Sequence, residues 1–128
     1  MAAAEGRHLA RFEALMRERR VRPTLLHPLW AAAGYAIGAG TALLGERAAL
    51  ACTVAIEEVI DQHYLAQAEY LEGDDPALAE TIRAFRDDEI AHRERALALG
   101  AEAAPLYELL AGAVKAGSRL AIRLSTRL

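Results

Sequence analysis

The chain has few of the features that stabilise folds other than packed helices. Cys52 is the only cysteine among 128 residues, so no disulfide can form within the chain, and a reducing compartment is expected. Aromatic residues make up 5% of the chain, whereas apolar residues make up 54% and are mainly alanine and leucine. This composition favours closely packed helices over a β-sandwich. The formal net charge of −3 gives no nucleic-acid signature, so no nucleic-acid partner is expected. No signal peptide is visible, because Glu5 interrupts the short apolar start.

The placement of prolines, glycines and apolar residues predicts one all-α domain. We expect five helices, at residues 2–20, 25–44, 46–72, 76–99 and from 105 to near the C-terminus. Pro23 disfavours helix at the residue before it, and Gly45 and Gly100 are typical helix stops. Asp75 is the expected N-cap of the fourth helix, with Pro76 at its first position.

Two Glu-x-x-His motifs dominate the chemistry of the sequence. Glu5 and His8 lie on the first expected helix, and Glu89 and His92 lie on the fourth. Residues three apart share one helix face, so each motif points a carboxylate and an imidazole in the same direction. Glu57 adds a carboxylate on the apolar face of the third helix, where an unpaired acid requires protonation, a partner or a metal. Paired motifs with further carboxylates build the two-metal sites of ferritin-like bundles, and we favour a metal site over a satisfied polar core.

The expected helix lengths bring these residues to one level. The segment from Glu57 to Glu72 covers roughly 23 Å, and the segment from Pro76 to Glu89 covers roughly 20 Å, at about 1.5 Å per residue. An antiparallel hairpin therefore places Glu57 beside Glu89. The first and third helices then run parallel, with the second helix as a long crossover between them, which is the ferritin-like connectivity.

Three neighbouring polar residues remain open to two interpretations. Asp88 either orients His8 through a hydrogen bond, as outer carboxylates do at metal sites, or is a plain surface acid. His63 and Tyr64 are either polar active-site groups or a histidine at the rim and a tyrosine in the core.

The segment 24–45 contains no Lys, Arg, Asp or Glu and follows a cluster of arginines at 17–22. Its length suits a membrane span, but Pro28 and several glycines make it only weakly apolar. We interpret it as a crossover helix that either lies on a membrane surface, with the arginines toward lipid headgroups, or is buried in the bundle.

Several long stretches, in collinear order, resemble the demethoxyubiquinone hydroxylase family. They are EGRHLARF, RVRPTLLHPLW, GAGTALLGERAALACTVAIEEVIDQHY, FRDDEIAHRERAL and KAGSRLAIRLSTRL. The resemblance implies a ferritin-like bundle in which two irons use O₂ and reductant to hydroxylate a quinone ring in ubiquinone biosynthesis. It implies that Glu5 and Glu89 bridge the irons. Glu57 and His92 would complete the coordination of one iron, and His8 would bind the other.

The same resemblance implies catalytic positions for His63 and Tyr64, near the quinone. Family members begin with a further helix that supplies a sixth ligand, a glutamate. We therefore expect residues 1–128 to form one ferritin-like domain that is N-terminally truncated relative to the family, with one terminal iron ligand missing.

The expected setting is a peripheral membrane location, on the cytoplasmic side of a bacterial inner membrane or at the mitochondrial inner membrane. The expected partners are a quinone substrate, the membrane surface, and either further copies of the chain or a partner chain that supplies the missing helix. The alternative is a non-catalytic or half-enzyme bundle that retains membrane or partner binding around an incomplete metal site.

Overall fold

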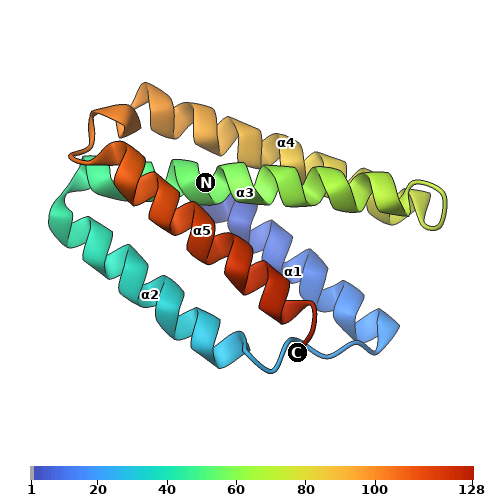
Figure 1. Cartoon of the computed structure of the whole chain (residues 1–128). Helices are drawn as coiled ribbons and strands as arrows, with labels where there is room; N and C mark the ends of the chain where they lie inside the picture. The colour runs from blue at the N-terminus through green and yellow to red at the C-terminus, as the bar shows by residue number, and fades with distance from the viewer. Residues whose placement is uncertain (1) are drawn as a thin grey trace.

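The computed structural model describes residues 2–128, which form helices joined by short turns (Figure 1). The elements are α1 (Ala2–Arg19), α2 (His27–Leu44), α3 (Glu46–Leu71), α4 (Pro76–Ala98), the short 3₁₀ helix η1 (Ala101–Ala103) and α5 (Tyr107–Ser125). No β-strand occurs in this part of the chain, so the predicted all-α class is confirmed. The five predicted helices are present, and each observed end lies within two residues of its expected position.

Helix α3 lies at the centre of the bundle and packs against α4, α5 and α2. Helices α3 and α4 form a long antiparallel hairpin, with the turn at one end of the molecule (Figure 1). Asp75 caps α4 as predicted, because its side chain accepts a hydrogen bond of 3.2 Å from the backbone N–H of Leu78. This hairpin places the two helices that carry Glu57 and Glu89 side by side.

The core consists mainly of small side chains. One cluster joins α3 to α5 and contains Cys52, which is buried as predicted, Ala55 and Ala111. A second cluster joins α3, α4 and η1 around Val54 and Ala96. Alanine fills little space, so these helices approach one another closely, and their contact faces offer few protruding side chains.

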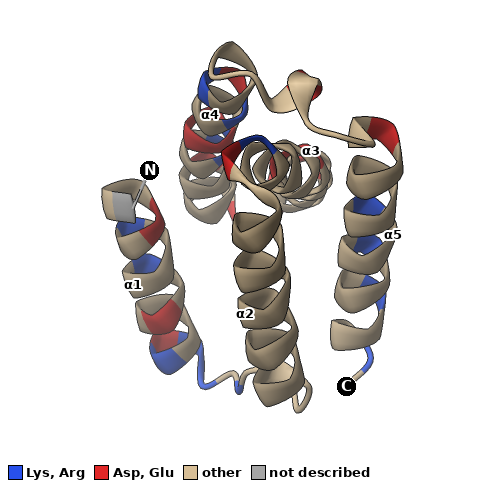
Figure 2. Ribbon diagram, turned by 90° about the vertical axis from the view of Figure 1, so that its left-hand side faces the viewer, with Lys and Arg blue, Asp and Glu red and all other residues tan. Residues whose placement is uncertain are grey.

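Helix α2 leaves most of its surface exposed. Among its described residues only Thr41 is buried, whereas Tyr35 and Leu43 are 82% and 89% exposed. Figure 2 shows that α2 carries no charged side chain along its length. Of the two interpretations of this helix, burial in the bundle is therefore wrong, because α2 packs mainly against α3 on one side; a position on a membrane surface stays a prediction. Within residues 2–128, no helix combines the length and hydropathy that crossing a membrane requires.

The connection before α5 differs from the expected simple stop and restart. Gly100 takes a left-handed conformation with φ 100°, and η1 then adds a short 3₁₀ turn. Leu106 is also left-handed, with φ 54°. Helix α5 consequently begins at Tyr107 and not at Pro105.

Candidate metal centre

Four side chains with metal-ligating atoms meet between α1, α3 and α4. They are Glu5, Glu57, Glu89 and His92, and one ligand atom from each lies within 4.8 Å of the others. Glu57, Glu89 and His92 are buried, whereas the side chain of Glu5 is 53% exposed. The expected convergence of Glu57, Glu89 and His92 is observed. Their role as metal ligands stays a prediction.

Glu89 and Glu5 each span the two histidines of the Glu-x-x-His motifs. Glu89 places Oε1 3.0 Å from Nδ1 of His8 and Oε2 3.7 Å from Nδ1 of His92. Glu5 places Oε2 4.0 Å from Nδ1 of His8 and Oε1 3.3 Å from Nδ1 of His92. Glu57 approaches His92 at 3.8 Å through Oε1. Two carboxylates therefore present one oxygen to each imidazole, which is the arrangement that bridging ligands of a two-ion site require.

His8 is buried and held in one orientation by α4. Its Nε2 lies 2.9 Å from Oδ2 of Asp88, and its ring stacks on Phe85 at a centroid distance of 4.1 Å. The hydrogen bond from His8, together with the nearby positive charges, holds the pKa of Asp88 below its usual value. Because an ionised carboxylate only accepts, Nε2 carries the proton, and Nδ1 of a neutral ring points a lone pair toward Glu89. Asp88 therefore orients His8, as the first of its two interpretations predicts.

The cluster contains buried polar atoms that no protein group satisfies. Among the described residues, the buried side-chain atoms without a hydrogen-bond partner are Nδ1 of His8, Oε2 of Glu57, Oε2 of Glu89 and Nδ1 of His92. Each such atom costs roughly 1–3 kcal/mol when buried without a partner. Three of these atoms belong to residues of the cluster, and Nδ1 of His8 lies 3.0 Å from Oε1 of Glu89, so bound cations would supply the partners that the protein does not. Carboxylates combined with imidazoles suit divalent iron or manganese.

The charge of the cluster also favours a cation. Burial, and then the neighbouring charge of Glu5, raises the pKa of Glu89 to about 7. The metal-free cluster thus gains stability by keeping a proton on Glu89 near neutral pH. A dication would replace that proton and offset the repulsion between the acids. The residues present therefore fit a metal centre.

Comparison with known proteins gives this cluster a family context. A family model described as "Ubiquinone biosynthesis protein COQ7" matches residues 1–125. The chain belongs to the COQ7 family. It is 55% identical over 127 residues to a 3-demethoxyubiquinol 3-hydroxylase of Rhodospirillum rubrum, which covers 99% of this chain and 60% of that protein.

Mitochondrial members of the COQ7 family are also similar to the chain. The human protein named NADPH-dependent 3-demethoxyubiquinone 3-hydroxylase is 49% identical over 128 residues, which covers 97% of this chain and 59% of that protein. The Caenorhabditis elegans protein of the same name is 35% identical over 128 residues, with 97% and 68% covered. The chain thus spans about three fifths of the length of the bacterial and human relatives.

In this COQ7-family chain, His63 and Tyr64 face different surroundings. Tyr64 lies on the side of the metal cluster, with its ring 6.3 Å from that of Phe12. Burial, and then the charge of Glu5, raises the pKa of Tyr64 to about 12. Burial lowers the pKa of His63, which lines a pocket of about 330 Å³ between α3 and α5. No hydrogen bond or ion pair among the described residues connects His63 to the four ligand groups.

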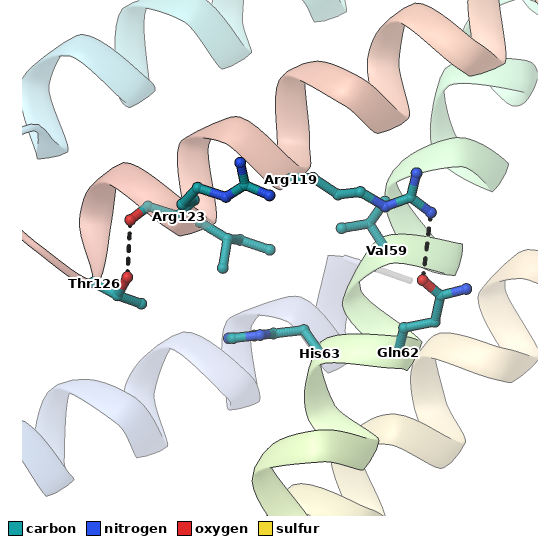
Figure 3. Close-up of a pocket in the computed structure, with 7 residues that line it drawn as sticks. Val59, Gln62, His63, Arg119, Arg123 and Thr126 are labelled. Carbon is teal, nitrogen blue, oxygen red and sulfur yellow. Dashed lines mark hydrogen bonds between the residues drawn. The ribbon is translucent and has the colours of Figure 1, made fainter.

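Figure 3 shows the pocket beside His63. Its lining includes Arg119 and Arg123 from α5, and the guanidinium of Arg119 donates a hydrogen bond of 3.4 Å to Oε1 of Gln62. The sequence interpretation missed these two arginines and the role of Phe85 against His8. Two signals were present: the arginines lie one turn apart on α5, and Phe85 precedes Glu89 by one turn on α4.

Proposed function

We propose that this chain carries the metal centre of a quinone-ring hydroxylase that acts on demethoxyubiquinone or its quinol in ubiquinone biosynthesis. The observation that carries the proposal is the pair Glu5 and Glu89, each of which offers one oxygen to His8 and one to His92. The similarity to hydroxylases over nearly the whole chain supports the same reaction. The two bound irons would supply O₂ activation, with reductant, for insertion of one oxygen atom into the ring.

Each residue of the centre has a proposed role. Glu5 and Glu89 would each offer an oxygen to both irons, Glu57 and His92 would complete the coordination of one iron, and His8 would bind the other. Asp88 fixes the tautomer of His8, and the ring of Phe85, which itself packs against Phe12, covers one face of that imidazole.

The proposed substrate is a quinone whose ring approaches the centre past Tyr64 and His63. Arg119 and Arg123 give the pocket beside His63 a positive charge, which suits the carbonyl oxygens of a quinone or an anionic reductant. The human relative is named as NADPH-dependent, and we propose a reduced nicotinamide as the source of electrons.

A sixth ligand is proposed to come from a helix outside residues 2–128, either on the same polypeptide or on a partner chain. Among the described residues, no further carboxylate joins the cluster of Glu5, Glu57, Glu89 and His92.

The isolated chain is expected to form dimers or larger species through its exposed apolar surface. Sedimentation of detergent-free protein tests this, and a soluble monomer at micromolar concentration would count against it.

The proposed location is a membrane surface, either the mitochondrial inner membrane or the cytoplasmic side of a bacterial inner membrane. The uncharged, largely exposed helix α2 follows the arginine-rich end of α1 along the chain, and Figure 2 shows no charged residue along it. Apolar residues flanked by arginines suit an anionic lipid interface. The names of the human and worm relatives include "mitochondrial".

The test is hydroxylation of a demethoxyquinone by the chain reconstituted with Fe(II), O₂ and a reduced nicotinamide, with product detected by mass spectrometry. We expect slow turnover that increases when a peptide with an acid-bearing helix is added. Glu89→Ala should abolish the product, whereas Glu94→Ala, an exposed acid on the same helix, should not change it. Absence of product under every condition would favour the non-catalytic alternative, which no observation on residues 2–128 favours at present.

A further inference from the structure

A charged triad joins α3 to α4 next to the metal centre. Asp61 of α3 accepts a hydrogen bond from Nε of Arg86 through Oδ1, and one of 3.3 Å from Nη1 of Arg93 through Oδ2. Both arginines belong to α4 and lie two turns apart, so the carboxylate is held between them. The side chain of Asp61 is only 14% exposed. We call these three residues the Asp61 clamp.

The Asp61 clamp is adjacent to the ligands in sequence. Asp61 follows Glu57 by one helical turn on α3. On α4, Arg86 precedes Glu89 by three residues, and Arg93 directly follows His92. Any axial movement of one helix against the other would therefore change the clamp and the metal centre together.

Most of the buried apolar positions on α3 and α4 are alanines, and Val54 and Ile82 are among the few larger ones. Ala51, Ala68, Ala79 and Ala96 are all buried and carry only a methyl group. Small side chains give few ridges and grooves, so neighbouring registers differ little in packing. A slip of one turn moves a residue by about 5.4 Å, which exceeds the 4.8 Å span of the ligand atoms. Alanine packing alone therefore leaves a role for a further contact that holds the register of the metal centre.

We infer that the Asp61 clamp fixes the register of α3 against α4 and thereby holds Glu57 level with Glu89 and His92. Buried polar groups are best established in such a registry role, because only one register satisfies them. Both oxygens of Asp61 are engaged in the observed register, and a slip would leave a poorly exposed carboxylate without its donors. The inference rests on the proposed metal centre for its functional consequence, but the register itself does not depend on metal.

The chain contains a matched control pair between the same helices. Glu72, at the end of α3, lies 3.4 Å from Arg83 of α4, with side chains 70% and 45% exposed. An exposed pair of this kind contributes little to stability or geometry. Replacing Glu72 therefore removes one α3–α4 ion pair without affecting a buried one.

The experiment compares Asp61→Asn with Glu72→Gln, using Co(II) alone as the metal probe. Asp61→Asn should weaken Co(II) binding by about tenfold or more, as losses next to a metal site do, and should change the visible Co(II) spectrum. Glu72→Gln should leave both the affinity and the spectrum unchanged.

The register is measured separately in metal-free protein, as the distance between two spin labels attached to cysteines that replace Arg47 and Ala84. A one-turn slip shifts this distance by about 5 Å, and Asp61→Asn should broaden or shift the distribution.

A triple variant covers the case in which Asp61→Asn does not fold. Asp61→Leu, Arg86→Leu and Arg93→Leu together replace the clamp by apolar groups, an exchange that often preserves or raises stability. A folded triple variant with weak Co(II) binding and a broadened distance would support the inference. Folded variants with wild-type affinity and distance would overturn it. If the unaltered chain binds no Co(II), the proposed metal centre fails, while the distance measurement still decides the role of the clamp.

Discussion

Removal of metal should make the stability of this protein depend on pH through Glu89. Its pKa rises from 4.5 to about 7 in the folded chain, so between these values the folded state binds a proton that the unfolded chain has released. The stabilisation from this proton is complete below pH 4.5 and disappears as the pH rises through 7. At 1.36 kcal/mol per pKa unit, the difference amounts to about 3 kcal/mol at most. Metal-free protein should therefore be less stable at pH 8 than at pH 5.

The assay is urea unfolding of chelator-treated protein at pH values from 5 to 8. Glu89→Gln removes the titrating group and should flatten the pH dependence, whereas Glu94→Gln, at an exposed position on α4, should retain it. The pKa of Asp88 is lowered, so the stability that this carboxylate contributes is lost as the pH falls below the usual pKa of an aspartate. That loss lies below the pH range of this assay. A pH dependence that is equally steep in wild type and Glu89→Gln would refute the assignment.

Three further predictions follow from the same geometry. Asp88→Asn should weaken Co(II) binding roughly 10–100-fold, because His8 loses the acceptor that fixes its tautomer; unchanged affinity in a titration would contradict this. Reconstitution of a verified monomer with Fe(II) should give fewer than two tightly held irons per chain by metal analysis, and two would show that residues 1–128 suffice. Val54→Ala should cost about 2 kcal/mol in urea unfolding, because Val54 is fully buried, while Leu109→Ala, at an exposed position, should change stability little.

The helices and the level of the ligands could be predicted because they depend on local rules. Gly45, Gly100 and Asp75 mark helix ends through backbone preferences that hold in any context. The rise per residue then places Glu57 beside Glu89. Leu99, by contrast, continues the apolar spacing of α4 but is 57% exposed, because the helix ends at Ala98. The exposure of α2 was also unpredictable, since an uncharged helix suits either a protein core or an apolar interface.

The finer features of the site depend on packing that sequence spacing does not determine. His63 and Tyr64 are neighbours, so their side chains diverge by about 100° around α3, and spacing did not show that Tyr64 lies on the side of the metal cluster whereas His63 lines a pocket against α5. Spacing put Glu5 and His8 on one face of α1, but it did not show which oxygen of Glu5 approaches which histidine. Asp61 lay on the apolar face of α3 in the sequence, yet its two arginine partners appear only when α4 is docked.

Several contacts between helix α1 and the bundle lie at or beside the proposed metal centre. His8 contacts Phe85, Asp88 and Glu89 of α4, and Phe12 meets Phe85 edge-on at 5.3 Å. Burial and the facing carboxylate of Glu5 on α1 raise the pKa of Glu89 to about 7, so in metal-free protein the two carboxylates repel each other and oppose docking of α1 once the pH rises through 7.

A bound dication would reverse this interaction between α1 and α4, because it attracts both carboxylates at once. Metal binding and the docking of α1 are therefore parts of one equilibrium. Apolar residues at positions 5 and 89 would give a more stable bundle and would leave no bridging ligand. The repulsion that weakens the metal-free fold when Glu89 is ionised is thus the same property that gives the cluster its affinity for a cation.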